Sequence, residues 1–293
     1  MSLSKQPKII VLGIDGLEYN LVEKWRLDNL MQKKFCKLNL SDFKVIVTPP
    51  IWGSMITGIV DKEIIELWTK YIKLIGNDEK LDEKTSTKIL GKIIPEKIGA
   101  WFQNHLIQFF VGGNPFEMTA NYVKNKNQKT VFDLFKKSWT NGIPGFGKNV
   151  SGEEQRKLTV QAIMGNKKPY IEFILEKYYE DKLLLLNELK KQDNDLIFWY
   201  TPMLDNFGHM GMGNPLKLMM KHYLEINNLV GEIIKMCPSS IIYVISDHGM
   251  ERIDQKKSSW GAHSDHAFFS SNTGEKIEKP PQLYDLISKH AND

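Results

Sequence analysis

The chain has 293 residues, enough to bury one large core or two small ones, and its composition is typical of soluble globular proteins. Its 39 basic and 35 acidic residues are mixed along the chain, so no basic block predicts nucleic-acid binding. The two cysteines, Cys36 and Cys237, have no CxxC spacing, which argues against a disulfide scaffold and a thiolate zinc site. Because we find no signal peptide and no apolar stretch long enough to cross a bilayer, we expect a cytoplasmic protein without a membrane partner.

The first apolar run in chain order covers residues 8–14 and ends at Asp15. A short uninterrupted run of this kind predicts a buried β-strand. Apolar residues at near-helical spacing then predict a helix over 17–31, and a further strand is expected within 38–47, over its last three residues. Asp15 is therefore expected at the carboxyl end of a central strand, where ligands bind in open α/β sheets.

Thr48 follows that second expected strand and stands before two prolines. Prolines favour the first turn of a helix, so a helix is predicted over 51–57, ended by Gly58. Two interpretations of Thr48 remain open. It caps the helix, or it is a nucleophile beside a helix end that favours a phosphate oxygen. A hydroxyl becomes a useful nucleophile only when a metal or a base lowers its pKa.

The next segment, 59–127, is predicted to form a small helical insertion or cap within a single domain that covers 1–293. Apolar residues at helical spacing occur both in this segment and in the rest of the chain. One further helix is expected to begin at Glu153. The other expected helices cover residues 62–75, 86–94, 98–110, 130–137, 169–191, 215–236 and 280–290.

Two more apolar runs, 195–200 and 241–245, are each followed by a carboxylate and an imidazole. The pairs are Asp205 with His209 after the first run, and Asp247 with His248 after the second. A spacing of four places two side chains on one face of a helix, and in a loop it lets both turn toward one ion. Carboxylate plus imidazole suits zinc, manganese or iron, although an ordinary polar turn explains each pair taken alone.

Apolar strands that alternate with helical segments predict an α/β fold with a mostly parallel central sheet flanked by helices. The carboxyl ends of parallel strands meet at one edge of such a sheet. The carboxylates that follow the three apolar runs are therefore expected close to one another.

Five short segments contain these residues: GIDG at 13–16, TPPIWGSMITG at 48–58, DNFGH at 205–209, SDHGM at 246–250 and GAH at 261–263. Together and in this order they resemble the alkaline phosphatase superfamily, and most of all its type I phosphodiesterase/nucleotide pyrophosphatase branch. The resemblance implies an alkaline phosphatase-like fold and two divalent metal ions a few ångströms apart, usually Zn²⁺, with Mn²⁺ as the other possibility.

The resemblance also implies a role for each matched residue. One ion is bound by Asp15, Asp247 and His248 with Thr48 as nucleophile, and the other is bound by Asp205, His209 and His263. His266 is a competing candidate, but His263 is preferred because it stands in a Gly-X-His context. The chain departs from the family at Ile51, where the nucleotide pyrophosphatase branch usually has an asparagine whose amide helps to hold the phosphate. Backbone N–H groups at the non-proline positions of 50–53 are therefore expected to hold a phosphate oxygen instead.

The expected function is therefore a metal-dependent phosphoric ester hydrolase. It would act as a phosphodiesterase or nucleotide pyrophosphatase on a small phosphate ester or nucleotide, through a phosphothreonine at Thr48. One alternative is a phosphomonoesterase or a phosphate-transfer enzyme of the mutase type, although a mutase of the phosphoglycerate type usually has a serine nucleophile and a larger inserted domain. The other is a non-catalytic binding protein that keeps the fold, which the filled ligand positions argue against.

Overall fold

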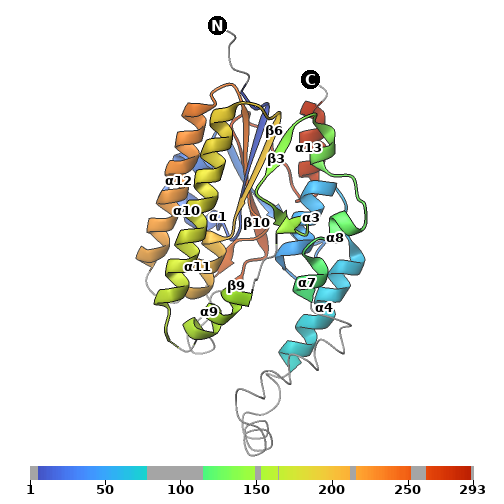
Figure 1. The fold of residues 1–293 in the computed structure, drawn as a ribbon, viewed down its shortest axis with the longest axis vertical. Helices are drawn as coiled ribbons and strands as arrows, with labels where there is room; N and C mark the ends of the chain where they lie inside the picture. Colours follow the sequence, from blue (N-terminus) through green and yellow to red (C-terminus); the bar gives the residue numbers. More distant parts are fainter. Residues whose placement is uncertain are drawn as a thin grey trace, which may run out of the picture.

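The computed structural model describes residues 6–77, 115–148, 153–163, 165–211, 216–251 and 262–291. Within these ranges the chain forms three layers, with a central sheet between two layers of helices (Figure 1). The main sheet has six strands in the order β2-β10-β7-β1-β6-β3 in the part of the chain that is described. These strands are β1 Ile9–Ile14, β2 Lys34–Asn39, β3 Ser138–Thr140, β6 Leu196–Thr201, β7 Ile241–Ile245 and β10 His266–Ser271.

Strand β1 lies inside the sheet between β6 and β7 and is parallel to both. Strand β3 is parallel to β6, whereas β10 is antiparallel to β7 and β2 is antiparallel to β10. The mostly parallel α/β sheet expected from the sequence is confirmed, with an antiparallel edge formed by β10 and β2. Because β6, β1 and β7 are parallel neighbours, their carboxyl ends lie at the same edge of the sheet.

Helices cover both faces of the sheet (Figure 1). The first face is covered by α1 Tyr19–Trp25, α2 Asp28–Met31, α9 Glu153–Ile163, α10 Lys168–Lys191, α11 Met203–Gly211 and α12 Leu216–Met236. The second is covered by α3 Thr48–Thr57, α4 Lys62–Asn77, α8 Tyr122–Asn125, η2 Val131–Leu134 and α13 Gln282–Ala291. The remaining short elements are α7 Pro115–Thr119, β4 Ile143–Pro144, β5 Gly147–Lys148, β8 Met250–Glu251 and β9 Ala262–His263.

The side chains of β1 alternate between two hydrophobic clusters, one on each face of the sheet. Ile10 and Leu12 pack into the first cluster, and Ile9 and Val11 pack into the second. All four are fully buried, which explains why the strand is an uninterrupted apolar run in the sequence. Full burial of one such side chain stabilises the fold by ~1.5–3 kcal/mol, so this strand is a rigid support for the residue that follows it.

Two predictions near the N-terminus are wrong in detail. The helix expected over 17–31 is divided into α1 and α2, because Arg26 adopts a left-handed conformation with φ of 50° and ends α1. The strand expected within 38–47 lies earlier, as β2, and residues 45–47 form the irregular approach to α3. Strand β2 is a partly exposed edge strand, so it lacks the continuous apolar run that identifies a buried strand.

The region around residue 130 also differs from its prediction. The helix expected over 130–137 is only the single turn η2, where Thr130 and Asp133 form a capping box. The next residues form β3, which the sequence analysis did not find. A strand of three half-buried residues has too short a pattern to be recognised without its partner β6.

The predicted insertion at 59–127 lies partly outside the described residues, as do the helices expected over 86–94 and 98–110. The helix expected over 62–75 is α4, and its Ile64, Ile65 and Trp68 pack into the second cluster. Both cysteines are free thiols. Among the described helices, none combines the length and the apolar character needed to cross a membrane.

Candidate metal centre

The carboxyl ends of β1 and β7 bring together three of the predicted ligands. Asp15 follows β1 directly, while Asp247 and His248 follow β7 after a single serine. The three residues are at most 2% exposed. His248 Nε2 lies 3.2 Å from Asp15 Oδ1 and 3.3 Å from Asp247 Oδ2. We call these three residues the buried group, and their ligand atoms are close enough to share one ion.

The other three predicted ligands form a second group at the same edge of the sheet. Asp205 and His209 lie four residues apart on α11, so of the two arrangements expected for this pair the structure has the helical one. His263 comes from β9. Asp205 Oδ1 lies 3.2 Å from His209 Nε2 and 3.5 Å from His263 Nε2, and the two imidazole nitrogens are 3.2 Å apart. We call this set the half-exposed group.

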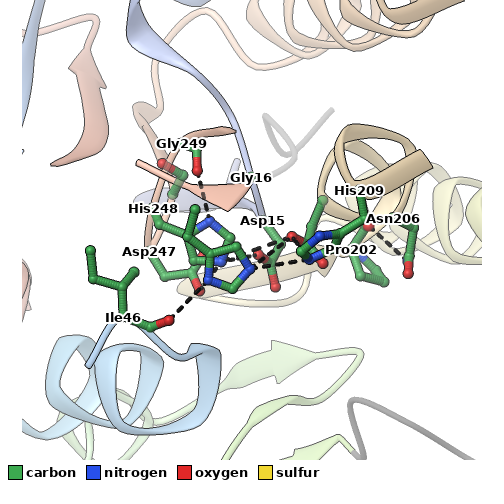
Figure 2. A network of polar contacts seen from close by, with 12 residues as sticks. Asp15, Gly16, Ile46, Pro202, Asn206, His209, Asp247, His248 and Gly249 are labelled. Atoms are coloured by element: carbon green, nitrogen blue, oxygen red, sulfur yellow. Dashed lines mark hydrogen bonds and ion pairs between the residues drawn. The ribbon is translucent and has the colours of Figure 1, made fainter. Parts of the chain in front are cut away.

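The two groups are adjacent (Figure 2). His248 Nε2 of the buried group lies 4.0 Å from Asp205 Oδ1 of the other, and the rings of His248 and His263 stack with centroids 3.6 Å apart. Gly16 permits this closeness. It has a φ of +72°, and a Cβ at this position would lie 2.6 Å from Asp205 Cα. Only glycine lets the turn after β1 pack directly on α11 in this conformation.

Backbone carbonyls determine the tautomers of two histidines. His248 Nδ1 lies 3.1 Å from Gly249 O, and His263 Nδ1 lies 2.9 Å from Ile46 O. A carbonyl only accepts, so each Nδ1 carries a proton and, in the neutral ring, each Nε2 presents a lone pair. Those lone pairs face carboxylate oxygens, which repel them unless a proton or a cation lies between.

The pKa values in the buried group reflect the same conflict. Burial, and then the charge of Asp205, raises the pKa of Asp15 to about 7. Burial and the charge of Asp15 raise the pKa of Asp247 well above its usual range. Burial, and then His263, lowers the pKa of His248 well below its usual value. Without a cation, the protein environment therefore disfavours the charges that it gathers here, which is a common property of functional sites.

The donor atoms fit divalent metal ions. Buried polar atoms that make no hydrogen bond to the described residues include Asp15 Oδ1, Asp205 Oδ1, both Asp247 carboxylate oxygens and His248 Nε2. Buried polar groups are normally hydrogen-bonded, so these atoms require an explanation. In a tetrahedral zinc site with bonds of about 2.0–2.1 Å, neighbouring ligand atoms are about 3.3–3.4 Å apart. The separations of 3.2–3.5 Å within the two groups match this spacing.

Tyr200 is a residue of the centre that the sequence analysis missed. It is buried in β6, and its hydroxyl donates to Asp15 Oδ2 at 2.6 Å. Its ring packs edge-on against Trp52, with centroids 5.3 Å apart. This hydrogen bond occupies one oxygen of Asp15 and leaves the other toward His248. The sequence signal is weak, because only the register of β1 against β6 shows that Tyr200 reaches Asp15.

Thr48 is the first residue of α3, and Val47 is the N-cap, so the capping interpretation of Thr48 is wrong. The contact between His263 Nδ1 and Ile46 O joins the half-exposed group to the chain two residues before Thr48 (Figure 2). Among the described residues, the structure shows no hydrogen-bond partner for the Thr48 hydroxyl. The half-buried threonine thus stands at the start of a helix whose entry segment contacts the centre.

The backbone donors at this helix end differ from those expected. Because α3 begins at Thr48, the N–H groups of Ile51 to Gly53 lie within the helical hydrogen-bond ladder, so their expected contact with a phosphate oxygen is wrong. Pro49 and Pro50 have no N–H group. The side chain of Ile51 is fully buried in the second cluster. Within the first turn of α3, only Thr48 itself therefore has an uncommitted backbone N–H.

His266, the competing candidate, belongs to neither group. Its Nε2 lies 3.1 Å from Glu18 Oε1, and its Nδ1 lies 3.0 Å from Asp265 Oδ1. Both ring nitrogens are therefore engaged by carboxylates outside the two groups. The geometry favours His263, in agreement with the preference drawn from its sequence context.

Comparisons with known proteins place the chain in a family. A family model described as type I phosphodiesterase / nucleotide pyrophosphatase matches residues 100–271, more than half of the chain. Asp15 and Thr48 precede the matched range. Among solved structures, the alkaline phosphatase from the Antarctic bacterium TAB5 is similar at 12% identity, over 98% of each chain, with a TM-score of 0.39. No curated protein matches this chain.

Proposed function

Since the chain belongs to the type I phosphodiesterase / nucleotide pyrophosphatase family, we propose that it hydrolyses phosphodiester or pyrophosphate bonds with two divalent metal ions and Thr48 as nucleophile. One observation carries the proposal. Buried carboxylate oxygens and imidazole lone pairs converge at 3.2–3.5 Å without protein donors between them. An arrangement that served only the fold would pair such groups with donors.

The two groups would each hold one ion, most readily Zn²⁺ or Mn²⁺ given carboxylate and imidazole donors. Such ions, when bound, lower the pKa of a hydroxyl and neutralise charge on phosphoryl oxygens. The chain itself fixes the direction of the ligands. Tyr200 holds one oxygen of Asp15, and the carbonyls of Gly249 and Ile46 hold the rings of His248 and His263.

In the proposed reaction, Thr48 Oγ1 attacks phosphorus, and the bond from phosphorus to the leaving alcohol or phosphate breaks. The hydroxyl proton departs with the leaving group. Water then attacks the phosphothreonine, the threonine oxygen leaves phosphorus, and a proton returns to Thr48. The N-terminal end of α3 supports both steps, because the helix dipole and the Thr48 N–H favour negative phosphoryl oxygens at this place.

The test measures release of p-nitrophenol from bis(p-nitrophenyl) phosphate by the purified protein with Zn²⁺ or Mn²⁺. We expect Thr48→Ala to lower kcat by at least about 1,000-fold, as expected for loss of a nucleophile. Thr69→Ala is the matched control, because Thr69 lies on α4 and its hydroxyl bonds only to Ile65 O in the described structure. Full activity of Thr48→Ala would show that another residue attacks phosphorus.

The same assay separates the alternatives. Faster release from p-nitrophenyl phosphate than from the diester would favour the phosphomonoesterase or phosphate-transfer function. Bound metal without hydrolysis of either compound would favour a binding protein. We expect the diester to be the better substrate, because the family is one of phosphodiesterases. The metal centre alone does not distinguish the two substrates, since hydrolysis of either would use the same centre.

A further inference from the structure

Glu18 is a buried carboxylate that belongs to neither ligand group. It is 3% exposed and lies three residues after Asp15, at the N-cap of α1. Glu18 Oε1 accepts a hydrogen bond from the N–H of Asn20 at 2.9 Å and faces His266 Nε2 at 3.1 Å. Glu18 Oε2 accepts from Ser264 Oγ at 3.0 Å. One side chain therefore joins the turn after β1 to the segment that follows His263.

Gly249 brings a third segment to the same carboxylate. A Cβ at this position would lie 2.1 Å from Glu18 Oε2 and 2.6 Å from Ser264 Oγ, closer than real contacts allow. Glu18 therefore lies directly against the backbone that follows His248. In addition, Gly249 O accepts from the N–H of Ser264, and the Gly249 N–H donates to His266 O, both at 2.9 Å.

We propose that Glu18 is a positioning residue that fixes three ligand-bearing segments relative to one another: the turn with Asp15, the loop with Asp247 and His248, and the segment with His263. It joins one segment of the half-exposed group to both segments of the buried group. Glu18 thereby couples the two ion sites without touching either ion. This inference rests on the proposed two-metal function.

A role in the cap of α1 alone does not account for these contacts. The cap uses only the hydrogen bond from the Asn20 N–H. The contacts to Ser264 and His266 join residues 246 and 248 positions apart and contribute nothing to α1. A buried carboxylate is stable only when it is paired and hydrogen-bonded, and the partners that satisfy Glu18 in this way include residues of the segment that follows His263.

The loss of this carboxylate should affect the two sites unequally. Asp15 remains fixed by the fully buried strand β1 and by the hydroxyl of Tyr200. His263 lies on β9, a strand of two half-buried residues that pairs only with β8 in the described structure. We therefore expect the half-exposed group to lose more affinity for metal than the buried group.

The experiment titrates the metal-free full-length protein with Zn²⁺ alone and follows binding by calorimetry. Glu18→Gln keeps the size of the side chain and removes its charge. We expect two sites in the wild type and, in the variant, a loss of about 10–100-fold in affinity at one of them, as for other residues that orient metal ligands. The visible absorption of the Co²⁺-loaded variant should also change, because the ligand geometry at that site changes.

Glu188→Gln is the matched control. Glu188 is also a buried acid, at 8% exposure, and it pairs with Lys191 and Asn194 beside the C-terminal end of α10. Its replacement should lower the unfolding temperature and leave Zn²⁺ affinity and the Co²⁺ spectrum unchanged. If Glu18→Gln does not fold, Ser264→Ala removes one of the contacts, and a smaller loss of affinity at the same site is expected.

The outcomes separate this inference from the proposed function. A wild-type protein that binds no divalent ion would contradict the proposed function. Two sites in the wild type with unchanged affinities and Co²⁺ spectrum in Glu18→Gln, or in Ser264→Ala if that variant must replace it, would overturn the role of Glu18 alone. Equal losses of metal affinity at both sites would contradict the expected asymmetry. Glu18 would then support the fold of the whole centre and would not position the segment with His263 in particular.

Discussion

The two ligand groups differ in how the fold builds them. The buried group follows two central strands, and its side chains are at most 2% exposed. The half-exposed group comes from a helix and a two-residue strand, and its side chains are 16–33% exposed. Burial disfavours charge in both, but in the second group His209 and His263 outweigh burial and hold the pKa of Asp205 well below its usual range.

This difference indicates what each group depends on. The half-exposed group surrounds one acid with two imidazoles, which stabilise its carboxylate when they carry a proton. The buried group places two acids beside one imidazole without compensating donors, so it depends on a cation for its charge balance. The rigid strand ends can hold the buried group in spite of its unfavourable charges. The helix and the short strand hold the half-exposed group, whose charges are closer to balanced without an ion.

The largest expected effect comes from the replacement of one acid in each group. Asp247→Asn and Asp205→Asn should each lower kcat by about 1,000-fold or more, as expected when an essential group of a catalytic centre is lost. Their effects on the metal-free protein should be opposite. Asp247→Asn removes a disfavoured buried charge and should raise the free energy of unfolding by ~1–3 kcal/mol. Asp205→Asn removes a favoured charge and should lower it.

Urea unfolding of both variants after removal of metal measures these free energies. Destabilisation of the metal-free protein by Asp247→Asn would contradict the charge imbalance that we assign to the buried group. A stabilising effect of Asp205→Asn would show that the two imidazoles do not balance their acid.

An intermediate effect is expected for Tyr200→Phe, which removes the hydroxyl donor to Asp15 and little else from the side chain. Metal affinity at the buried group should fall by about 10–100-fold, with the half-exposed group less affected. This is the reverse of the asymmetry expected for Glu18→Gln. Calorimetric titration with Zn²⁺ measures both.

Tyr178→Phe serves as the control for Tyr200→Phe. The Tyr178 hydroxyl donates to Glu225 Oε1 at 3.2 Å on the helical layer, away from the ligand groups. This variant should leave metal affinity unchanged. If Tyr200→Phe loses affinity equally at both groups, the two sites are not held independently in the way that the strand and helix supports suggest.

The smallest effect concerns the support of α11. His222 on α12 is 3% exposed and stacks on Phe207, between the two ligands on α11, with ring centroids 3.8 Å apart. Burial, and then Lys221, lowers the pKa of His222 to about 4. Because the folded state prefers the neutral ring, stability is full above about pH 6.5 and falls as the pH decreases toward 4, by an amount on the order of 2–3 kcal/mol.

Urea unfolding of the metal-free protein between pH 4 and 7 measures this dependence, and His222→Gln should weaken it. The carboxylates of the buried group change the free energy of unfolding with the opposite sign over part of this pH range. The free energies of the variant and the wild type are therefore compared at each pH. An unchanged dependence in His222→Gln would show that His222 does not titrate with folding.

The sequence predicted those parts of the fold that have strong local patterns. The uninterrupted runs of β1, β6 and β7 and the long periodic helices α10 and α12 lie within one residue of their predictions. Elements defined by their partners were mispredicted. Strand β2 is an edge strand paired only with β10, and β3 is recognisable only beside β6. The division of the first helix depends on one left-handed residue, Arg26.

The candidate ligand residues were predictable for a related reason. Asp15, Asp247 and the pair on α11 stand at fixed positions after buried strands, and parallel strands bring those positions to one edge. The order of the motifs along the chain resembles that of the family, so His263 could be predicted although only a two-residue strand carries it. The helix spacing of Asp205 and His209 was one of two arrangements that the sequence allowed.

By itself, then, the sequence determined which side chains follow the buried strands, because apolar runs and the polar residues that end them are local properties of the chain. Only the tertiary structure decided how they are held. The hydroxyl of Tyr200 on Asp15, the Ile46 carbonyl on His263, and the carboxylate of Glu18 on Ser264 all join segments that are distant in sequence. Strand register and loop packing bring these groups within hydrogen-bonding distance, and no local pattern encodes that distance.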